Sequence, residues 1–196
     1  HDMFGPSRVF QSLADAQAAR GRCVLVPNLF WRSEPDGVLP YEGSHAAAWA
    51  RLERFDADAA VAELRHAVAW LRRAPEASGK VAVWGFCFSG TLAFLAAARA
   101  GVDAALSFYA LGISRRLAEA ARIACPTQLH YGAADEHVPA SEIDAVAAGV
   151  AGNARIALHR YQGAGHSFFN PVRPTYDAVA SALAAERVDA LLDRLA

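Results

Sequence analysis

The sequence predicts an α/β fold in which a mostly parallel sheet is covered by helices on both faces. Short apolar runs that favour strands alternate along the chain with alanine-rich helical stretches, and uncharged strands separated by helices are typical of a sheet that is buried on both sides. The 196 residues match the size of one domain, and no linker, repeat or shift of composition divides them. We therefore expect a single domain over residues 1–196.

The predicted elements alternate in order. Gly21 and Gly101 come directly after two of the helices, where glycine is the preferred residue for ending a helix. The predicted strands are Cys23–Pro27, Val81–Gly85, Ala104–Tyr109, Thr127–Gly132 and Arg155–Tyr161. The predicted helices lie near Ser7–Arg20, Asp56–Arg73, Thr91–Ala100, Ser141–Ala151 and Tyr176–Leu195. In the last helix, the residues expected to pack on the sheet are Val179, Leu183, Val188 and Leu191 or Leu192.

The overall charge gives no sign of a polyanionic partner. A net charge of -1, from 19 basic and 20 acidic residues, provides no general attraction for nucleic acid or for an anionic membrane. Three cysteines are an odd number, which argues against a disulfide framework and for a reducing compartment. The first residues lack the basic and apolar regions of a secretory signal. We therefore expect a cytoplasmic enzyme or binding protein.

One uncharged stretch, from Val81 to Ala98, is long enough to imitate a membrane span. It divides into a β-rich run at residues 81–84, turn residues from Gly85 to Gly90 and a helical run from Thr91 onward. This division predicts a buried strand, a sharp turn and a buried helix. In a parallel sheet, residues that follow strands gather at one edge, and active sites form there.

The turn Gly85-Phe86-Cys87-Phe88-Ser89-Gly90 lies between a predicted strand and a predicted helix, which is the setting of a nucleophile elbow. Such a turn strains the backbone of its nucleophile, and small residues are needed two positions before and two positions after it. Gly85 and Ser89 meet this requirement around Cys87. The nearby helix N-terminus also favours a thiolate over a thiol. We therefore predict that Cys87 is the nucleophile.

Other interpretations of these residues stay open. A free cysteine is more often an inert buried hydrophobe, which suits Cys23 in a predicted strand and Cys125 before a proline. Ser89 is a rival nucleophile, although it would place Cys87 where glycine is usual and would lie half a turn into the helix. A redox-sensing thiol is a further interpretation, but no second cysteine lies near Cys87 in the sequence to resolve a sulfenate.

A cysteine nucleophile needs a general base. Of the seven histidines, His166 lies in a glycine-bearing loop directly after the last predicted strand, where its side chain can reach back across the sheet edge. His130 and His159 fall inside predicted strands and are expected to be core or sheet-face residues. We therefore predict that His166 is the base.

The base in turn needs an acid that fixes its tautomer. Asp135 follows an intermediate strand, with Glu136 and His137 as neighbouring rivals and a plain turn residue as the alternative. The order nucleophile, acid, histidine is that of the α/β-hydrolases, and Cys87, Asp135 and His166 follow it. The sequence therefore predicts a catalytic triad assembled from three loops.

Three segments of the chain resemble the dienelactone hydrolases, a family with the α/β-hydrolase fold. The similarity is densest in residues 85–95, 135–139 and 163–168. It implies that Cys87 is the nucleophile, Asp135 the acid and His166 the base. It also implies cleavage of an ester or lactone through a thioester on Cys87, with His166 protonating the leaving alkoxide and then activating water.

The same resemblance gives a role to the first residues, His1-Asp2-Met3-Phe4-Gly5. In the family, an acidic residue of this loop, commonly glutamate, interacts with the resting cysteine, and the next residue donates a backbone N–H to the oxyanion hole. Carried over, Asp2 takes the first role and Met3 the second, with the Phe88 N–H as the other donor. The alternative is that Asp2 is a solvated terminal residue.

The expected substrate-binding residues lie close to the catalytic histidine. Arginines of the family hold the carboxylate of the lactone through bidentate hydrogen bonds. Where one of them is expected, this sequence has an asparagine, so the candidates are Ser167, Asn170 and the nearby Arg173. The second arginine is expected within residues 45–54, a stretch that matches the family weakly.

Two other functions fit the same residues. One is a general carboxylesterase or thioesterase of the same fold, and the other is a catalytically silent binding module, which the aspartate at position 2 and the altered substrate pocket suggest. The sequence has no G-x-G-x-x-G after a strand, no P-loop and no H-E-x-x-H motif, so we expect no cofactor and no metal. The expected partner is a small ester or lactone rather than nucleic acid or a membrane, and the chain is expected to be a monomer or a homodimer.

The predicted strands are about three fewer than a complete hydrolase of this type has, and the first residues already match a loop that follows an early strand. Three strands of about 5–6 residues, with short connections, amount to roughly 30 residues. No methionine precedes His1. We therefore expect that the chain lacks an N-terminal segment of the native protein.

Overall fold

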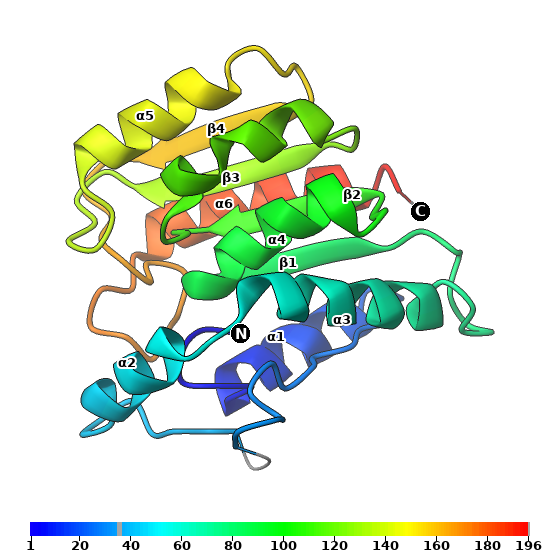
Figure 1. Cartoon of the computed structure of the whole chain (residues 1–196), viewed down its shortest axis with the longest axis horizontal. Helices are drawn as coiled ribbons and strands as arrows, with labels where there is room; N and C mark the ends of the chain where they lie inside the picture. The colour runs from blue at the N-terminus through cyan, green and yellow to red at the C-terminus, as the bar shows by residue number, and fades with distance from the viewer. Residues whose placement is uncertain (35–36, 196) are drawn as a thin grey trace.

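A single parallel sheet lies at the centre of the molecule (Figure 1). The computed structural model describes residues 1–34 and 37–195, and within them the strands are ordered β1-β2-β3-β4, each paired in parallel with the next. The strands are β1 (Ala82–Phe86), β2 (Ala104–Phe108), β3 (Thr127–Gly132) and β4 (Ile156–Tyr161). The predicted parallel sheet is therefore confirmed for these segments.

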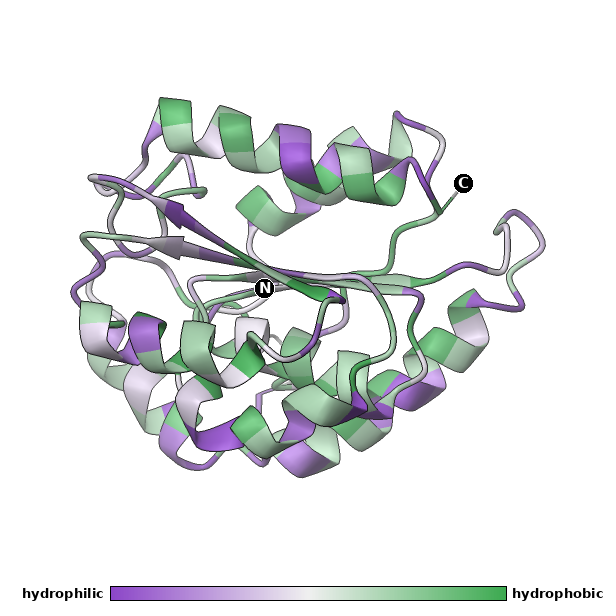
Figure 2. Ribbon diagram, turned by 90° about the horizontal axis from the view of Figure 1, so that it is seen from above, coloured by the Kyte–Doolittle hydropathy of each residue, from purple (hydrophilic) through white to green (hydrophobic). Residues whose placement is uncertain are grey.

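Helices form a layer on each face of this sheet, which Figure 2 shows nearly edge-on between them. One face carries α3 (Ala57–Leu71), α4 (Phe88–Arg99), the 3-10 helix η1 (Ile113–Arg122) and α5 (Ala140–Val150). The other face carries α1 (Arg8–Ala18) and α6 (Ala178–Leu192). A short helix, α2 (His45–Glu53), packs through Ala48 into the same apolar cluster as Phe88 at the start of α4.

The two layers are fixed by the alternation of side chains along each strand. On β1, Trp84 and Phe86 join the apolar cluster under α1 and α6, whereas Val83 between them packs with the cluster under α4 and α5. On β2, Leu106 and Ala105 divide between the two faces in the same way. Both faces of the sheet are therefore apolar, as a sheet buried on both sides requires.

The prediction of a strand at Cys23–Pro27 is wrong. This segment is in no strand, and its Val24 and Leu25 side chains are 42% and 40% exposed. A cavity of about 430 Å³ is lined by residues of this segment together with residues of β1, α1 and the C-terminal end. Within the described residues the segment is paired with no strand, and a β-rich composition alone cannot make a strand without a partner.

The prediction for the face of α6 is right at one end of the helix and wrong at the other. Val188 and Leu191 are buried, but Val179 is 81% and Leu183 is 41% exposed. The residues that turn towards the sheet follow the helical spacing Ala180, Ala184, Val188 and Leu191. Since Val179 and Leu183 precede two of these positions by one residue each, they lie about 100° around the helix from the buried stripe.

The sequence did not reveal two elements, because one has no clear apolar face and the other is rich in charged residues. The α2 sequence HAAAWARLE has no clear apolar face, and η1 has the charge-rich sequence ISRRLAEAAR after Gly112. The uncharged stretch Val81–Ala98, in contrast, forms β1, a turn at Cys87 and α4, as predicted. Among the described residues, no helix combines the length and the apolar character that crossing a membrane requires.

A fully buried histidine lies in the sheet beneath α6. His130 on β3 is 0% exposed, its ring is stacked on Phe108, and its two ring nitrogens bond to Tyr161 Oη at 2.7 Å and to Gln128 Oε1 at 3.1 Å. The amide oxygen of Gln128 only accepts hydrogen bonds, so His130 Nε2 carries the proton and Nδ1 accepts from the Tyr161 hydroxyl. Burial holds the pKa of His130 well below its ordinary value.

We predict that this histidine makes the fold sensitive to mild acid. The unfolded chain binds a proton at His130 below pH 6.5 and the folded chain does not, so the free energy of unfolding falls as the pH drops below 6.5, by up to ~1.4 kcal/mol per pH unit. Urea denaturation at several pH values measures this slope. His130→Gln should lower it, whereas the same change at the exposed His66 should leave it as in the wild type. Equal slopes in wild type and His130→Gln would contradict the prediction.

Candidate active site

The turn between β1 and α4 presents Cys87 in a strained backbone conformation. Cys87 has φ 58° and ψ -125°, a region that residues with side chains rarely adopt. A Cβ on Gly85 would lie 1.9 Å from the Ser89 carbonyl oxygen, so the turn closes only because residue 85 has no side chain. Cys87 directly precedes the first residue of α4, and its thiol therefore lies at the N-terminus of that helix.

The neighbouring serine supports this turn from the inside. Ser89 is 3% exposed, and its hydroxyl accepts from the Phe86 N–H at 2.8 Å and lies 2.5 Å from the His1 carbonyl oxygen. A hydroxyl engaged with the backbone on the buried side of the turn does not face a substrate. These contacts favour Cys87 over Ser89 as the nucleophile.

His166 and Asp135 meet beside this turn from the loops that follow β4 and β3. The His166 Nδ1 atom lies 2.8 Å from Asp135 Oδ2, and the His166 ring lies close enough to Cys87 for the charge of the sulfur to act on it. The other carboxylate oxygen, Oδ1, accepts from the backbone N–H groups of His137 at 2.8 Å and Val138 at 3.0 Å. One carboxylate therefore fixes both its own loop and the histidine. Asp135 is buried, whereas its sequence rivals Glu136 and His137 are exposed.

The charges of this cluster favour a protonated histidine. Burial alone would lower the pKa of His166, but its hydrogen bonds to Asp135 and Cys87, and the charges of these groups, raise it to about 10. Because this folded value lies above the ordinary 6.5, protonated His166 stabilises the fold at low pH, and this contribution is lost as the pH rises towards 10. The arrangement suits an imidazolium held between a carboxylate and a sulfur.

A tyrosine that sequence reasoning did not single out packs against the same histidine. Tyr109 follows β2 directly, is 1% exposed, and its ring centroid lies 5.0 Å from that of His166. Three residues other than glycine have positive φ in the described structure, namely Cys87, Tyr109 and Ser167. All three follow strands at the same edge of the sheet, where backbone strain is concentrated around functional groups. In the sequence, an aromatic residue directly after a strand cannot be distinguished from an ordinary core residue, so Tyr109 was not identified.

Asp2 and Met3 lie in a tight turn beside this edge. The Asp2 carboxylate accepts from the Phe4 N–H at 2.9 Å and from the Tyr41 hydroxyl at 3.2 Å, and the Gly5 N–H donates to the Asp2 carbonyl oxygen. Asp2 is 5% exposed, so it is not a solvated terminal residue. Among the described residues, no hydrogen bond joins Asp2 to the Cys87 sulfur.

Arg51 anchors this turn from α2. Its side chain is 1% exposed, and one of its amino groups lies 3.3 Å from the Met3 carbonyl oxygen and 3.0 Å from that of Gly37. It also forms an ion pair with Glu34. A Cβ on Gly5 would lie 1.9 Å from the Gly37 carbonyl oxygen, which shows how closely the two loops pack. Arg51 belongs to the stretch where a substrate-binding arginine was expected, but its guanidinium is buried in these backbone contacts.

The three predicted substrate-binding residues differ in exposure. Ser167 and Asn170 are 6% and 2% exposed, and the Asn170 side-chain amide donates to the Tyr41 hydroxyl at 3.0 Å. Arg173 is partly exposed, with its guanidinium over the rings of Phe4 and Tyr41, 5.4 and 5.2 Å from their centroids. The Arg173 guanidinium also lies 3.4 Å from His45 Nε2. Of the three, Arg173 is the residue available to a ligand.

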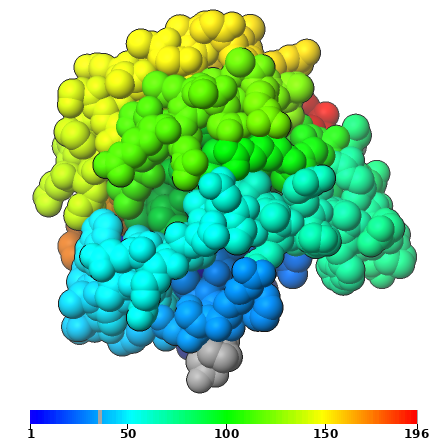
Figure 3. All heavy atoms as spheres, viewed as in Figure 1, coloured from blue at the N-terminus to red at the C-terminus, as the bar shows by residue number. Residues whose placement is uncertain are grey.

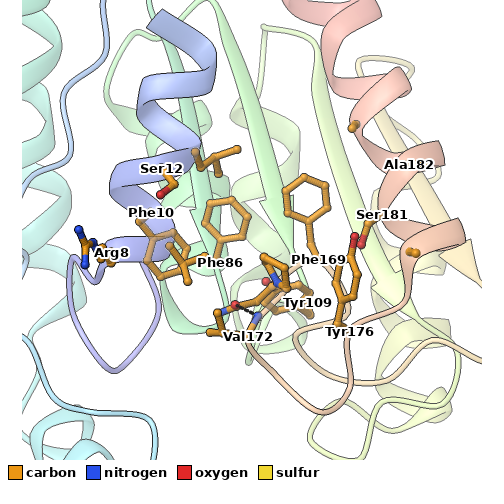
Figure 4. Close-up of a pocket in the computed structure, with 16 residues that line it drawn as sticks. Arg8, Phe10, Ser12, Phe86, Tyr109, Phe169, Val172, Tyr176, Ser181 and Ala182 are labelled. Atoms are coloured by element: carbon orange, nitrogen blue, oxygen red, sulfur yellow. Dashed lines mark hydrogen bonds between the residues drawn. The ribbon is translucent and has the colours of Figure 1, made fainter. Parts of the chain in front are cut away.

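The molecular surface has two recesses near this edge of the sheet. The face shown in Figure 3 is hollowed between α2 and the segments that follow β2 and β3. On the opposite side of the sheet, an apolar groove of about 600 Å³ runs between α1 and α6, with the rings of Phe10, Phe86 and Phe169 along it (Figure 4). The lining of this groove includes neither Cys87 nor His166. The groove is therefore separate from the cluster formed by these two residues.

The described residues include no group of three or more His, Cys, Asp or Glu side chains placed to hold a metal ion.

A parallel sheet with a nucleophile elbow, followed by an acid and a histidine on later loops, defines the α/β-hydrolase class. The sequence matches the dienelactone hydrolase family over residues 1–195. The chain belongs to this family and is a hydrolase.

Curated relatives agree with this assignment. The chain is 32% identical over 188 residues to carboxymethylenebutenolidase of Pseudomonas putida, covering 95% of this chain and 80% of that protein. It is 30% identical over 198 residues to carboxymethylenebutenolidase 1 of Cupriavidus pinatubonensis, covering 99% and 83% of the two chains.

Solved structures share the fold. A candidate dienelactone hydrolase from Klebsiella pneumoniae superposes with a TM-score of 0.86 at 20% identity, covering 98% of this chain and 84% of that one. A dienelactone hydrolase-like promiscuous phosphotriesterase from metagenomic libraries superposes with a TM-score of 0.78 at 23% identity, covering 99% and 83%. At these identities the likeness shows the fold alone.

We predict that Asp135 sustains the raised pKa of His166. In Asp135→Asn, the amide oxygen can still accept from the backbone of its loop, but the negative charge is gone, so the pKa of His166 should fall from about 10 towards 6.5. An NMR titration of the His166 ring measures this. Glu136→Gln, a charge removed one residue away at an exposed position, should leave the pKa near 10. An unchanged titration in Asp135→Asn would show that another group holds the proton.

Proposed function

We propose that the protein hydrolyses an ester or lactone by covalent catalysis at Cys87. The observation that carries this proposal is the position of His166, which bonds to Asp135, lies close enough to Cys87 for the two charges to interact, and has a pKa raised to about 10. A protonated histidine beside the sulfur favours the thiolate, which is the nucleophilic form of cysteine. Membership of the dienelactone hydrolase family supports the same reaction class.

In the first half of the reaction, the Cys87 sulfur attacks the carbonyl carbon of the substrate and forms a tetrahedral oxyanion. The backbone N–H groups of Met3 and Phe88 are the proposed donors to this oxyanion, and one such donor is worth about 2.7–4 kcal/mol of barrier in a comparable site. Collapse of the intermediate breaks the bond to the leaving oxygen, which takes a proton from His166. The acyl group then remains on Cys87 as a thioester.

In the second half, His166 acts as a base. It removes a proton from water, the resulting hydroxide attacks the thioester carbon, and the carboxylic acid product leaves as the sulfur departs. The Asp135 carboxylate stabilises the imidazolium whenever it forms. The expectation that Asp2 is the resting partner of the Cys87 thiol stays a prediction.

We predict that Cys87→Ala abolishes turnover of activated esters, lowering kcat/KM by at least roughly a thousandfold, because no group replaces the nucleophile. Steady-state hydrolysis of an aryl ester measures this. Cys23→Ala removes the exposed cysteine and should leave the rate unchanged. Activity of Cys87→Ala near the wild-type level would refute the covalent mechanism.

The substrate is proposed to carry a carboxylate that Arg173 binds. The relatives are named for the hydrolysis of carboxymethylenebutenolide, an anionic lactone. Arg173 supports this choice because its guanidinium lies over the rings of Phe4 and Tyr41, and among the described residues no carboxylate forms a salt bridge with it. The contacts of Asn170 favour a supporting role, and the role of Ser167 stays a prediction. A cytoplasmic location and a monomeric or dimeric state also stay predictions.

We predict that Arg173→Gln removes a preference for the free acid over its methyl ester. A bidentate contact between guanidinium and carboxylate contributes to binding, so KM for a dienelactone acid should rise roughly 10- to 100-fold while that for its methyl ester changes little. Arg65→Gln, at an exposed position on α3, serves as the matched control and should change neither value. Equal effects of Arg173→Gln on acid and ester would show that Arg173 does not recognise the carboxylate.

A further inference from the structure

Three loops that surround the candidate site meet at one tyrosine hydroxyl. Tyr41 Oη lies 3.2 Å from Asp2 Oδ2, 3.0 Å from Asn170 Nδ2 and 3.1 Å from Ser7 Oγ. Asp2 belongs to the turn that contains Met3, and Asn170 follows His166 by four residues in the loop after β4. The hydroxyl therefore connects the loop of the proposed oxyanion donor to the loop of the proposed base.

The hydrogen-bonding capacity of this hydroxyl is fully used. A carboxylate only accepts and a side-chain N–H₂ only donates, so Tyr41 donates its proton to Asp2 and accepts from Asn170, and Ser7 is then the second donor to it. One donated and two accepted bonds are all that a phenol can form. Burial, together with the negative charge of Asp2, raises the pKa of Tyr41 to about 12, so it keeps this proton throughout the neutral range.

The Asp2 carboxylate, which accepts the proton of Tyr41, is stabilised by two hydrogen-bond donors. Asp2 is buried, which raises its pKa, and the hydrogen bonds from the Phe4 N–H and the Tyr41 hydroxyl oppose this effect. The Phe4 bond closes the turn in which Met3 lies. The Tyr41 bond holds that turn against the loop of Asn170. If the turn moved, the buried Asp2 carboxylate would lose one of these two donors, and a buried charge without a hydrogen-bond donor is costly.

We propose that Tyr41 is a positioning residue for the oxyanion hole. Through its bond to Asp2, it keeps the Met3 N–H at a fixed position relative to His166. This inference rests on the proposed function, because it concerns the hole that the ester reaction would use. Tyr41 touches none of the reacting atoms in the proposal. Its contribution is to the placement of a donor, which matters when the oxyanion forms and not when the substrate first binds.

The test is Tyr41→Phe, which removes the hydroxyl and keeps the ring that packs on Phe4 and Arg173. We expect kcat for an aryl ester to fall roughly 10- to 100-fold with KM changed less than about threefold, because a donor displaced by about an ångström fails chiefly in the transition state. Tyr176→Phe removes the hydroxyl of a partly exposed tyrosine from the same loop as Asn170, and should leave kcat unchanged.

A double-mutant cycle with Asp2→Asn separates this role from a general loss of packing. Phe4 and Tyr41 donate to different oxygens of Asp2, and in Asp2→Asn an N–H₂ group that only donates replaces one of these oxygens, so one of the two bonds is lost. If Tyr41 acts through Asp2, the double variant loses no more kcat than the more damaged single variant. If the losses of kcat in the two single variants multiply in the double variant, the two residues act independently, which would contradict the proposal.

Alkylation of Cys87 by iodoacetamide provides a readout without an oxyanion. The proposal requires the alkylation rate of Tyr41→Phe to remain within about twofold of the wild type across pH while ester turnover falls. A large change in the alkylation rate of Tyr41→Phe would show that Tyr41 acts on the sulfur and not on the oxyanion donor, and would overturn this proposal. If Tyr41→Phe does not fold, Asp2→Asn alone decides, and an unchanged kcat in that variant overturns the proposal.

The failures of the two proposals are distinguishable. Ester turnover that survives complete alkylation of Cys87 would refute the proposed function itself. Turnover that is abolished by alkylation, with wild-type kcat in Tyr41→Phe, would refute only the role of Tyr41.

Discussion

Gly85 has no side chain, and the turn between β1 and α4 can close for that reason alone: a Cβ there would lie 1.9 Å from the Ser89 carbonyl oxygen. The closed turn gives Cys87 its φ of 58° and places its sulfur where β1 ends and α4 begins. A Cβ on Gly90 would lie 2.9 Å from the Phe108 carbonyl oxygen, so the helix also packs closely on β2. The loops that carry Asp135 and His166 are placed relative to this turn because β2 pairs with β1, β3 with β2 and β4 with β3.

The second requirement of the site is that its buried charges be matched. Asp135 uses one oxygen to hold its own loop and the other to hold His166. The charge of Cys87 in turn acts on the His166 ring. A charge buried without a partner is costly, so this chain of contacts accounts for the raised pKa of His166. The same rule governs Asp2, whose two oxygens are satisfied by Phe4 and Tyr41 outside that chain.

The two arginines near the site show why residue type alone does not define a role. Arg51 and Arg173 both lie in stretches where a carboxylate-binding arginine was expected. Arg51 is 1% exposed and its guanidinium bonds to backbone carbonyl groups and Glu34, so it holds the turn that contains Met3 in place. Arg173 is partly exposed over Phe4 and Tyr41. Partners and burial, which depend on tertiary packing, separate a structural cation from one that can meet a ligand.

The sequence by itself determined the parallel sheet, the strand-turn-helix unit at Cys87 and the order of Cys87, Asp135 and His166, because local periodicity and the need for small residues in the turn set these features. Tertiary structure decided what depends on distant partners. Residues 23–27 have strand-forming side chains but pair with no strand of the described sheet, and Ser89 is turned into backbone contacts. The bond between Tyr41 and Asp2 joins residues 39 positions apart. No local spacing encodes such a pair, since it exists only when folding brings two loops to the same edge of the sheet.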